Sequence, residues 1–222
     1  TSVTPNTTAT ADGADEDGVT MPTSISVGSA VTIPVSVFNN NTAGRFLQAW
    51  IDFDNNGIFN DSDVTSGGER IYNVATPASA SQQNINVSFN VPSLASRGAQ
   101  RGVRFRLSSA ATTPTASGVS GEIEDYVVTI ACPSITIGPA SVGDGVQWFP
   151  YSSTAITAIG GTGPYSYTRT GALPPGMALS TGTSMNLSGT PSQSGTFNFT
   201  VTATDVSGCA ATRAYSLTIG SP

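Results

Sequence analysis

Short runs of alternating apolar and polar residues, separated by turn-forming residues, constrain this chain more than any other feature. Residues 84–91 (NINVSFNV) and 102–108 (GVRFRLS) both alternate in this way. A period of two places one face of a strand on a core and the other face in water. The 24 Gly and 14 Pro residues supply turns between such runs, because both residue types favour turn conformations. The chain is therefore predicted to be all-β.

The same pattern divides the chain into two sets of strands. The first set is expected near residues 24–27, 31–38, 46–53, 70–74, 84–91, 102–108 and 124–130. The second is expected near residues 134–137, 147–160, 165–169, 177–180, 184–189, 196–205 and 213–219. We predict two antiparallel β-sandwich domains in series, at residues 11–131 and 132–222. Residues 1–10 are polar and Thr-rich, which indicates a linker or an added edge strand.

The composition excludes several classes of function. The chain contains no Lys and no His, so a Ser-His-Asp triad is impossible within it. The net charge is −6, and this excess lies entirely before residue 132, with twelve acidic residues against six Arg. An acidic surface without Lys speaks against binding to nucleic acid or to anionic membranes. No apolar run is long enough to cross a bilayer, so membrane insertion is not expected.

The two cysteines bracket the second domain. Cys132 begins this domain, and Cys209 precedes its last strand. We interpret them as a disulfide between the first strand and the final hairpin, with a pair of buried free thiols as the alternative. In the chain-entropy model, closing so long a loop stabilises the fold by roughly 4 kcal/mol. A disulfide in turn indicates an oxidising, extracellular environment.

An acidic loop follows the strand that carries Trp50. Residues 52–63 read DFDNNGIFNDSD, and this spacing is similar to that of an EF-hand calcium loop, which alternates oxygen ligands around a central Gly. The predicted side-chain ligands are Asp52, Asp54, Asn56 and Asp63, and Ile58 would contribute its backbone carbonyl. Because the twelfth position holds Asp63 rather than a bidentate Glu, the match is incomplete. We predict a structural Ca²⁺ ion here.

Two further acidic stretches flank this loop in the sequence. Residues 12–18 contain Asp15 and Asp17, and residues 121–125 contain Glu122, Glu124 and Asp125. Strand alternation places at least one of the latter carboxylates on the core side, where a charge needs a cation or several donors. We expect these residues to complete the calcium shell or to hold a second ion.

Two alternatives remain open at this stage. Asn55-Asn56-Gly57 is a good hairpin turn by itself, and Arg104 or Arg106 could neutralise Glu122 or Glu124 without a metal. Paired carboxylates such as Asp52 and Glu122 could serve a glycosidase, but about 130 residues with short loops leave little room for a cleft. We therefore expect no enzyme. Trp50 and Trp148 are expected in the cores rather than on a sugar-binding face.

The residues also resemble known families. DEDGVTMP (15–22), QAWIDFDNNGIFND (48–61), RFRLSS (104–109) and especially GEIEDYVVTI (121–130) are similar to the GEVED domain of bacterial secreted and surface proteins. In the second half, GGTGPYSYT (160–168), GALPPGMALS (171–180), LSGTPSQSGTFNFTVTATD (187–205) and SGCAATRAYSLTI (207–219) resemble immunoglobulin-like domains of the He-PIG, cadherin-like type. Between these stretches the family's short lead appears as GDGVQWFPYSS (143–153), a departure from the pattern.

The resemblance implies a modular extracellular protein without catalytic activity. The expected function is a structural or adhesive segment of a bacterial surface protein, stiffened by calcium and a disulfide. Its partners would be other surface modules or copies of itself, with glycans as a further class. A subunit of a self-assembling fibre and a carbohydrate-binding accessory module are the competing expectations.

Overall fold

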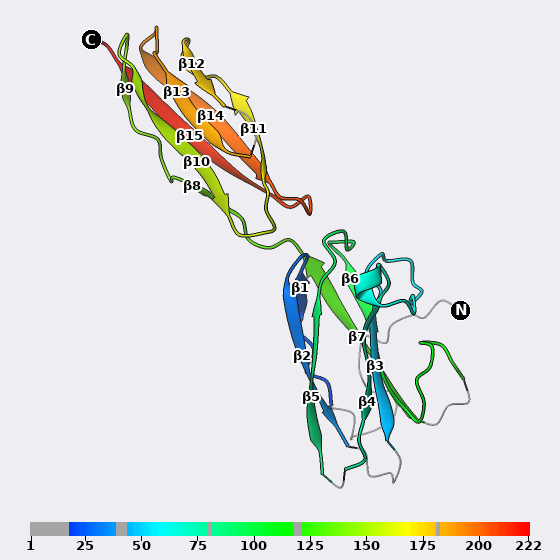
Figure 1. Ribbon diagram of the computed structural model, residues 1–222. Helices are drawn as coiled ribbons and strands as arrows, with labels where there is room; N and C mark the ends of the chain where they lie inside the picture. Colours follow the sequence, from blue (N-terminus) through cyan, green and yellow to red (C-terminus); the bar gives the residue numbers. More distant parts are fainter. Residues whose placement is uncertain (1–17, 39–43, 80, 118–120, 181–182) are drawn as a thin grey trace. The chain divides into compact units, whose positions relative to one another are not determined.

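The computed structural model describes residues 18–38, 44–79, 81–117, 121–180 and 183–222. It divides the chain into two compact units, Thr1–Ala131 and Cys132–Pro222. Both units are built from strands, and the described residues add only the short 3-10 helix η1 (Val64–Ser66) (Figure 1). No helix in this part of the chain is long and apolar enough to cross a membrane. The predicted all-β class is confirmed, whereas residues 1–10 lie outside the described residues.

Unit 1 consists of a five-stranded sheet and a two-stranded sheet. The larger sheet has the order β1-β7-β6-β3-β4, and the smaller one pairs β2 with β5. Their bounds are β1 (Ser24–Ser26), β2 (Ala30–Val37), β3 (Arg45–Ile51), β4 (Arg70–Thr76), β5 (Gln83–Asn90), β6 (Gln100–Ser108) and β7 (Gly121–Ala131). All seven strands fall where the alternating runs predict them.

The core of unit 1 lies between these two sheets. Alternate residues of β2 and β5 are buried, among them Ile33 and Val87, which pair across the two strands. From the larger sheet, Ala49 of β3 lies opposite Phe105 of β6, and both side chains are buried. The period of two in the sequence thus corresponds to one inward-facing layer on each sheet.

The other face of the large sheet is also buried. Trp50 lies opposite Arg104 and Gln48 lies opposite Arg106 in the β3–β6 ladder. Trp50, Gln48 and Arg106 are all buried, although they alternate with the inward-facing residues. Gln48 reaches the loop that follows β6, exchanging two hydrogen bonds with the backbone of Thr112, at 2.9 and 2.8 Å. Loops therefore cover this outer face, and they position the site described below.

Unit 2 is a sandwich of two four-stranded sheets, with the orders β12-β13-β10-β8 and β11-β14-β15-β9. Its core includes Ile156, Leu187, Val201 and Leu217. The strand bounds are β8 (Thr136–Gly138), β9 (Gly145–Val146), β10 (Tyr151–Ile159), β11 (Ser166–Gly171), β12 (Met177–Leu179), β13 (Met185–Gly189), β14 (Gly195–Thr204) and β15 (Ala210–Gly220).

The structure differs from the predicted strands in two respects. The β1–β7 and β9–β15 pairs are parallel rather than antiparallel. The strand expected over residues 147–160 begins only at Tyr151, because residues 147–149 form a turn after the short strand β9. Trp148 has φ 68° in this turn, a conformation that a strand cannot contain.

The predicted disulfide is present. Cys132 and Cys209 are bonded, with a sequence separation of 77 and a Cα–Cα distance of 5.5 Å. Cys209 directly precedes β15, at the end of the β14–β15 hairpin. The buried Asp205 closes this hairpin by accepting the backbone N–H groups of Ser207 and Cys209, at 2.9 and 2.8 Å. The bridge therefore anchors the start of unit 2 to its final hairpin.

Candidate metal centre

Three carboxylates converge where β3 ends. Asp52, Asp54 and Glu69 each offer an oxygen, and these oxygens lie within 4.8 Å of one another. Asp52 is 7% exposed and Glu69 is 4% exposed, whereas Asp54 reaches solvent. Two of the three negative charges are therefore withdrawn from water, which is unfavourable without a compensating cation or hydrogen-bond donors.

The strand register brings Asp52 and Glu69 together. Asp52 follows the last residue of β3 and continues the ladder, since its N–H donates to the carbonyl of Gly102, 3.0 Å away. Glu69 immediately precedes β4, and its carbonyl accepts the N–H of Ile51 at 3.0 Å. Because β3 and β4 pair antiparallel, the end of one strand meets the beginning of the next.

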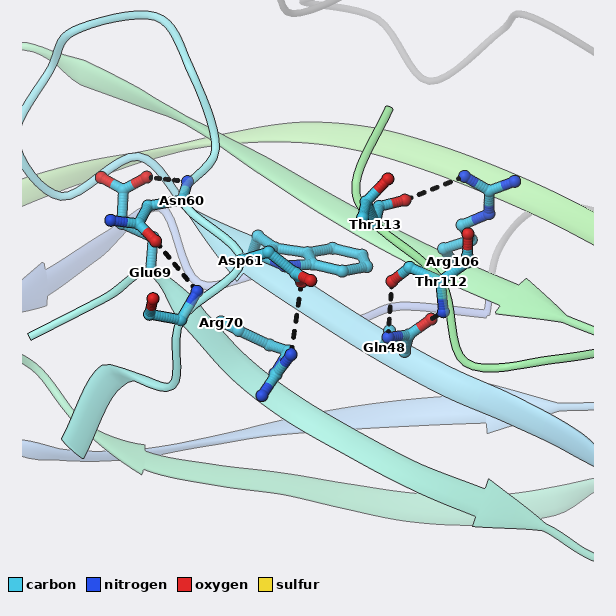
Figure 2. A network of polar contacts seen from close by, with 10 residues as sticks. Gln48, Asn60, Asp61, Glu69, Arg70, Arg106, Thr112 and Thr113 are labelled. Atoms are coloured by element: carbon cyan, nitrogen blue, oxygen red, sulfur yellow. Dashed lines mark hydrogen bonds and ion pairs between the residues drawn. The ribbon is translucent and has the colours of Figure 1, made fainter. Parts of the chain in front are cut away.

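The loop between them folds its backbone around the carboxylates. Asp52 accepts the N–H groups of Asn56 and Gly57, at 3.1 and 3.0 Å. Glu69 accepts the N–H of Asp54 at 3.3 Å and that of Asn60 at 2.8 Å. Figure 2 shows Glu69 reaching toward Asn60 across the loop. Backbone N–H groups thus satisfy part of the hydrogen-bonding capacity of Asp52 and Glu69, and the loop brings the three acids close together.

Two residues in the left-handed region let the loop turn this tightly. Asn55 has φ 64° and Gly57 has φ 78°. Arg101 holds the first of them, because its Nη1 donates to Asn55 Oδ1 at 3.0 Å. This arginine is fully buried, and its remaining donors bind carbonyls such as that of Ser96. The sequence did not single out Arg101 as a residue that supports this site.

Burial changes the ionisation of the two enclosed acids. Desolvation raises the pKa of Asp52, although the backbone N–H of Gly57 acts in the opposite direction. Desolvation likewise raises the pKa of Glu69, and the backbone N–H of Asn60 opposes it. In both acids the loss of water outweighs the fixed donors. A divalent cation would remove this penalty by neutralising the charges directly.

No arginine neutralises the cluster within the described residues. The two ion pairs found there join Arg70 to Asp61 and Arg104 to Asp125. Three carboxylates with an adjacent Asn side chain form an all-oxygen donor set, which suits a hard cation such as Ca²⁺. The set contains neither nitrogen nor sulfur donors, so it does not suit zinc.

The third carboxylate is not the one expected from the sequence. Asp63, assigned to the last position of an EF-hand loop, instead caps η1, where its Oδ1 accepts the N–H of Thr65 at 2.9 Å. The hydrogen bond from the Thr65 hydroxyl, and to a lesser extent the one from its N–H, lower the pKa of Asp63. The chain leaves the loop through η1 and returns in β4, and Glu69, directly before β4, joins Asp52 and Asp54.

The side chains of Asn56 and Asn60 form local turns within the loop. Asn56 is exposed, and its Nδ2 donates to Asp54 Oδ2 at 2.8 Å. Its Oδ1 accepts the N–H of Ile58 at 2.7 Å. Asn60 makes a similar turn with Ser62, at 2.9 Å. These local turns agree with the alternative that the loop is built mainly from Asn and Asp turns.

The acidic stretch at residues 121–125 does not join this cluster. Asp15 and Asp17 lie outside the described residues. Asp125 pairs with Arg104 at 2.6 Å, and Glu124 accepts a hydrogen bond from the hydroxyl of Tyr126. Glu122 and Glu124 line a cavity of about 340 Å³ between the sheets. None of these three described residues belongs to the carboxylate group at Asp52.

The arginine partners also differ from the sequence-based alternative. Arg104 binds Asp125 rather than Glu122 or Glu124, because the β6–β7 register places Arg104 directly opposite Asp125. Arg106 donates to the carbonyls of Thr113 and Ala116, at 3.2 and 2.9 Å. Figure 2 shows Arg106 and Gln48 reaching the same loop. Both arginines thus fasten the covering loops.

Trp50 belongs to the structural support of the loop. It is fully buried, and its Nε1 donates to Asp61 Oδ1 at 3.0 Å. The same oxygen accepts Arg70 Nη1 at 3.3 Å, so Asp61 connects the acidic loop to both β3 and β4 (Figure 2). This burial confirms the expectation of a core position and excludes Trp50 as a sugar-binding surface. The same expectation for Trp148 is wrong, because its side chain is exposed.

Two family models match successive parts of the chain. Residues 46–129 match the family model of the GEVED domain, and residues 126–220 match the model described as "Putative Ig domain" (He_PIG). No curated protein matches the chain at a significant level.

Several solved structures are similar at low sequence identity. The human desmocollin-1 ectodomain shares 12% identity with a TM-score of 0.32, covering 90% of this chain and 39% of that one. Mouse cadherin-23 EC22-24 shares 13% identity with a TM-score of 0.33, covering 87% and 74%. The fibronectin(III)-like modules of Clostridium thermocellum CbhA share 12% with a TM-score of 0.26, covering 91% and 93%. Likenesses this weak carry no functional argument.

Proposed function

We propose that the chain is a non-catalytic structural or adhesive segment of a bacterial surface protein, because residues 46–129 match the GEVED model and residues 126–220 match the He_PIG model. The Cys132–Cys209 disulfide supports an extracellular location, since such bonds persist in oxidising compartments. Other modules of the same surface protein, or copies of this chain, are the partners that a serial arrangement of sandwiches would contact.

The proposed role of the metal centre is to stiffen unit 1 with a Ca²⁺ ion. The observation that carries this proposal is the convergence of Asp52, Asp54 and Glu69 within 4.8 Å, two of them buried without a basic partner among the described residues. The ion would take oxygens from these acids and from Asn56. It would then join the end of β3 to the beginning of β4 and fix the long loop between them.

Calorimetry of the whole chain with and without calcium tests this proposal. A ligand that binds only the folded state stabilises it by mass action, about 2.7 kcal/mol at a hundredfold excess over Kd. We expect chelation to lower the melting temperature of the transition that belongs to unit 1. The transition of unit 2 should not move, because its described residues contain no group of three clustered acids.

The two transitions can be assigned with the tryptophans. Trp50 is fully buried in unit 1, so its fluorescence reports the unfolding of that unit. Mg²⁺ at the same concentration serves as a control for general ionic effects, because it demands a smaller, near-octahedral shell. If the transition reported by Trp50 fluorescence has the same melting temperature in calcium and in chelator, the loop is a hydrogen-bonded turn and the metal proposal fails.

A further inference from the structure

An aromatic loop on unit 2 has no role in the function proposed above. Residues 147–150 connect β9 to β10 and contain Trp148 and Phe149. These side chains are 61% and 58% exposed, respectively, although both are large and apolar. Single exposed apolar residues are common, but two adjacent exposed aromatics in a short loop require an explanation.

The loop is held firmly in place. The N–H of Gln147 donates to the carbonyl of Gly220 at 2.9 Å, and its Nε2 donates to the carbonyl of Ser192 at 2.8 Å. The N–H of Trp148 donates to the carbonyl of Pro191 at 2.8 Å. These bonds tie the loop to the end of β15 and to the segment after β13. Its aromatic side chains are therefore displayed from a fixed backbone.

Trp148 occupies a conformation that its side chain disfavours. Its φ of 68° lies in the left-handed region, where Gly is the usual residue and a bulky residue is an outlier. Backbone strain of this kind persists where the surrounding structure enforces it, and it concentrates at functional sites. A Gly would meet the conformational need without strain, so the presence of Trp calls for a role of the indole itself.

A groove adjoins this loop and has a mixed chemical character. Its volume is about 440 Å³, and Phe149 and Tyr151 contribute aromatic surface to its lining. Ser152 and Thr154 line it with hydroxyl groups, and Asp144 lines it with a carboxylate. Asp144 is the only charged residue of this lining, which contains no Arg. The groove therefore combines aromatic faces with polar groups and lacks any positive charge.

We propose that the groove and the adjoining Trp148 bind an uncharged glycan. The C–H face of a pyranose packs on aromatic rings, while its hydroxyls bond to Ser152, Thr154 and the Asp144 carboxylate. A few polar groups among apolar walls are typical of small-ligand sites. The negative charge of Asp144 disfavours uronic or sialic acids. This inference concerns unit 2 alone and does not depend on calcium in unit 1.

Isothermal titration of the whole chain with soluble neutral oligosaccharides tests the proposal. The probes are the hexasaccharides of cellulose, xylan, mannan and chitin, with polygalacturonic acid oligomers as the charged comparison. We expect binding of at least one neutral probe and a blue shift of the Trp148 fluorescence, because Trp50 is already buried. Trp148→Gly should weaken this binding at least tenfold without lowering the melting temperature, since Gly accepts the left-handed conformation.

Two further variants keep the test decisive if Trp148→Gly alters the fold. Phe149→Ala removes groove lining but leaves the backbone at Trp148 unchanged, so it should weaken binding as well. Ile159→Ala removes an apolar side chain that is 70% exposed at the other end of β10 and should bind normally. Failure of every neutral probe, or equal binding by wild type and Phe149→Ala, would overturn the proposal. The proposal would also be overturned if the chain bound no sugar but formed a concentration-dependent dimer that Trp148→Gly abolished.

Discussion

In the proposed calcium site, Glu69 takes the place that the EF-hand spacing assigns to Asp63. If the cation sits at the carboxylate cluster, Glu69→Gln removes a buried ligand charge and should abolish calcium-dependent stabilisation of unit 1. Asp63→Ala should instead cost about 0.5–2 kcal/mol through loss of the η1 cap, while the calcium response persists. Thermal unfolding followed by Trp50 fluorescence, with and without calcium, distinguishes the two variants.

The reverse outcome would contradict this assignment. If Asp63→Ala lost the stabilisation of unit 1 by calcium and Glu69→Gln kept it, the ligand would be Asp63, as the EF-hand spacing predicts, and not Glu69. Asp61→Asn is a useful comparison, because Asp61 belongs to the same loop but bonds to Trp50 and Arg70 instead of the cluster.

Acidity should act on the metal-free and calcium-bound forms in opposite directions. Burial raises the pKa of Asp52 and Glu69, so the folded state binds their protons more tightly than the unfolded state does. The unfolding free energy of the metal-free protein should therefore fall as the pH rises from about 4 through the raised values. Calcium competes with these protons, so its stabilising effect should grow over the same interval.

Urea unfolding at several pH values, on protein stripped with a chelating resin, measures both slopes. The double variant Asp52→Asn, Glu69→Gln carries no titratable group at these positions, and it accounts for the remaining acids, including Asp63 with its lowered pKa. If the unfolding free energy of the metal-free wild type rose with pH relative to that of the double variant, the two acids would not be held in a desolvated state.

Residue positions were predictable where they depend on local spacing. Asp52, Asp54 and Asn56 follow each other at alternate positions, and the structure brings Asp54 close to both of the others, whereas their role as ligands stays a prediction. Glu69 was missed because it comes from the far side of a loop that no spacing rule describes. The pairing of β3 with β4 would have indicated it, since this register sets Arg70 against Trp50 and so brings Glu69 beside Ile51.

At the scale of elements, substitution of Gln48 on the outer face of the β3–β6 pair should strongly lower the stability of unit 1. Its amide exchanges two hydrogen bonds with Thr112 in the loop after β6 (Figure 2). Gln48→Leu keeps the volume but leaves these backbone groups without their partner, which should cost about 1–3 kcal/mol. Chemical denaturation measures the change, with Asn86→Leu on the exposed face of β5 as a control. A cost no greater than that of the control would show that the loop cover adds no stability.

Strand positions followed from the alternation, but strand partners did not. A period of two identifies an inward face without naming the neighbour or its direction, so the parallel β1–β7 and β9–β15 pairs were not foreseen. The strand expected at 147–149 is absent from the structure because residues 147–149 form a turn. The Trp-Phe-Pro run is apolar, yet Trp148 turns the chain and Pro150 has no N–H to contribute to a ladder.

At the scale of the whole molecule, the separate cores predict two independent unfolding transitions. Reduction of Cys132–Cys209 should lower the stability of unit 2 by about 2–5 kcal/mol, because a long loop is released in the unfolded state. Calorimetry with and without a reductant should show the unit 1 transition at an unchanged temperature. Asp205→Ala, which removes the carboxylate that accepts the backbone N–H groups of Ser207 and Cys209, should lower the stability of the same unit. Movement of the unit 1 transition in either experiment would contradict independent folding.

The position of the disulfide also determines how unit 2 responds to mechanical tension. A pull that enters at Cys132 and leaves at the C-terminal end passes directly through the bridge to Cys209. Strands β8 to β14 are then bypassed, and only β15 and the residues after it carry the load. The 77 positions closed by the bridge, about 270 Å of extended chain, stay locked. Single-molecule stretching should therefore release that length only after reduction, and the oxidised unit acts as an almost inextensible link.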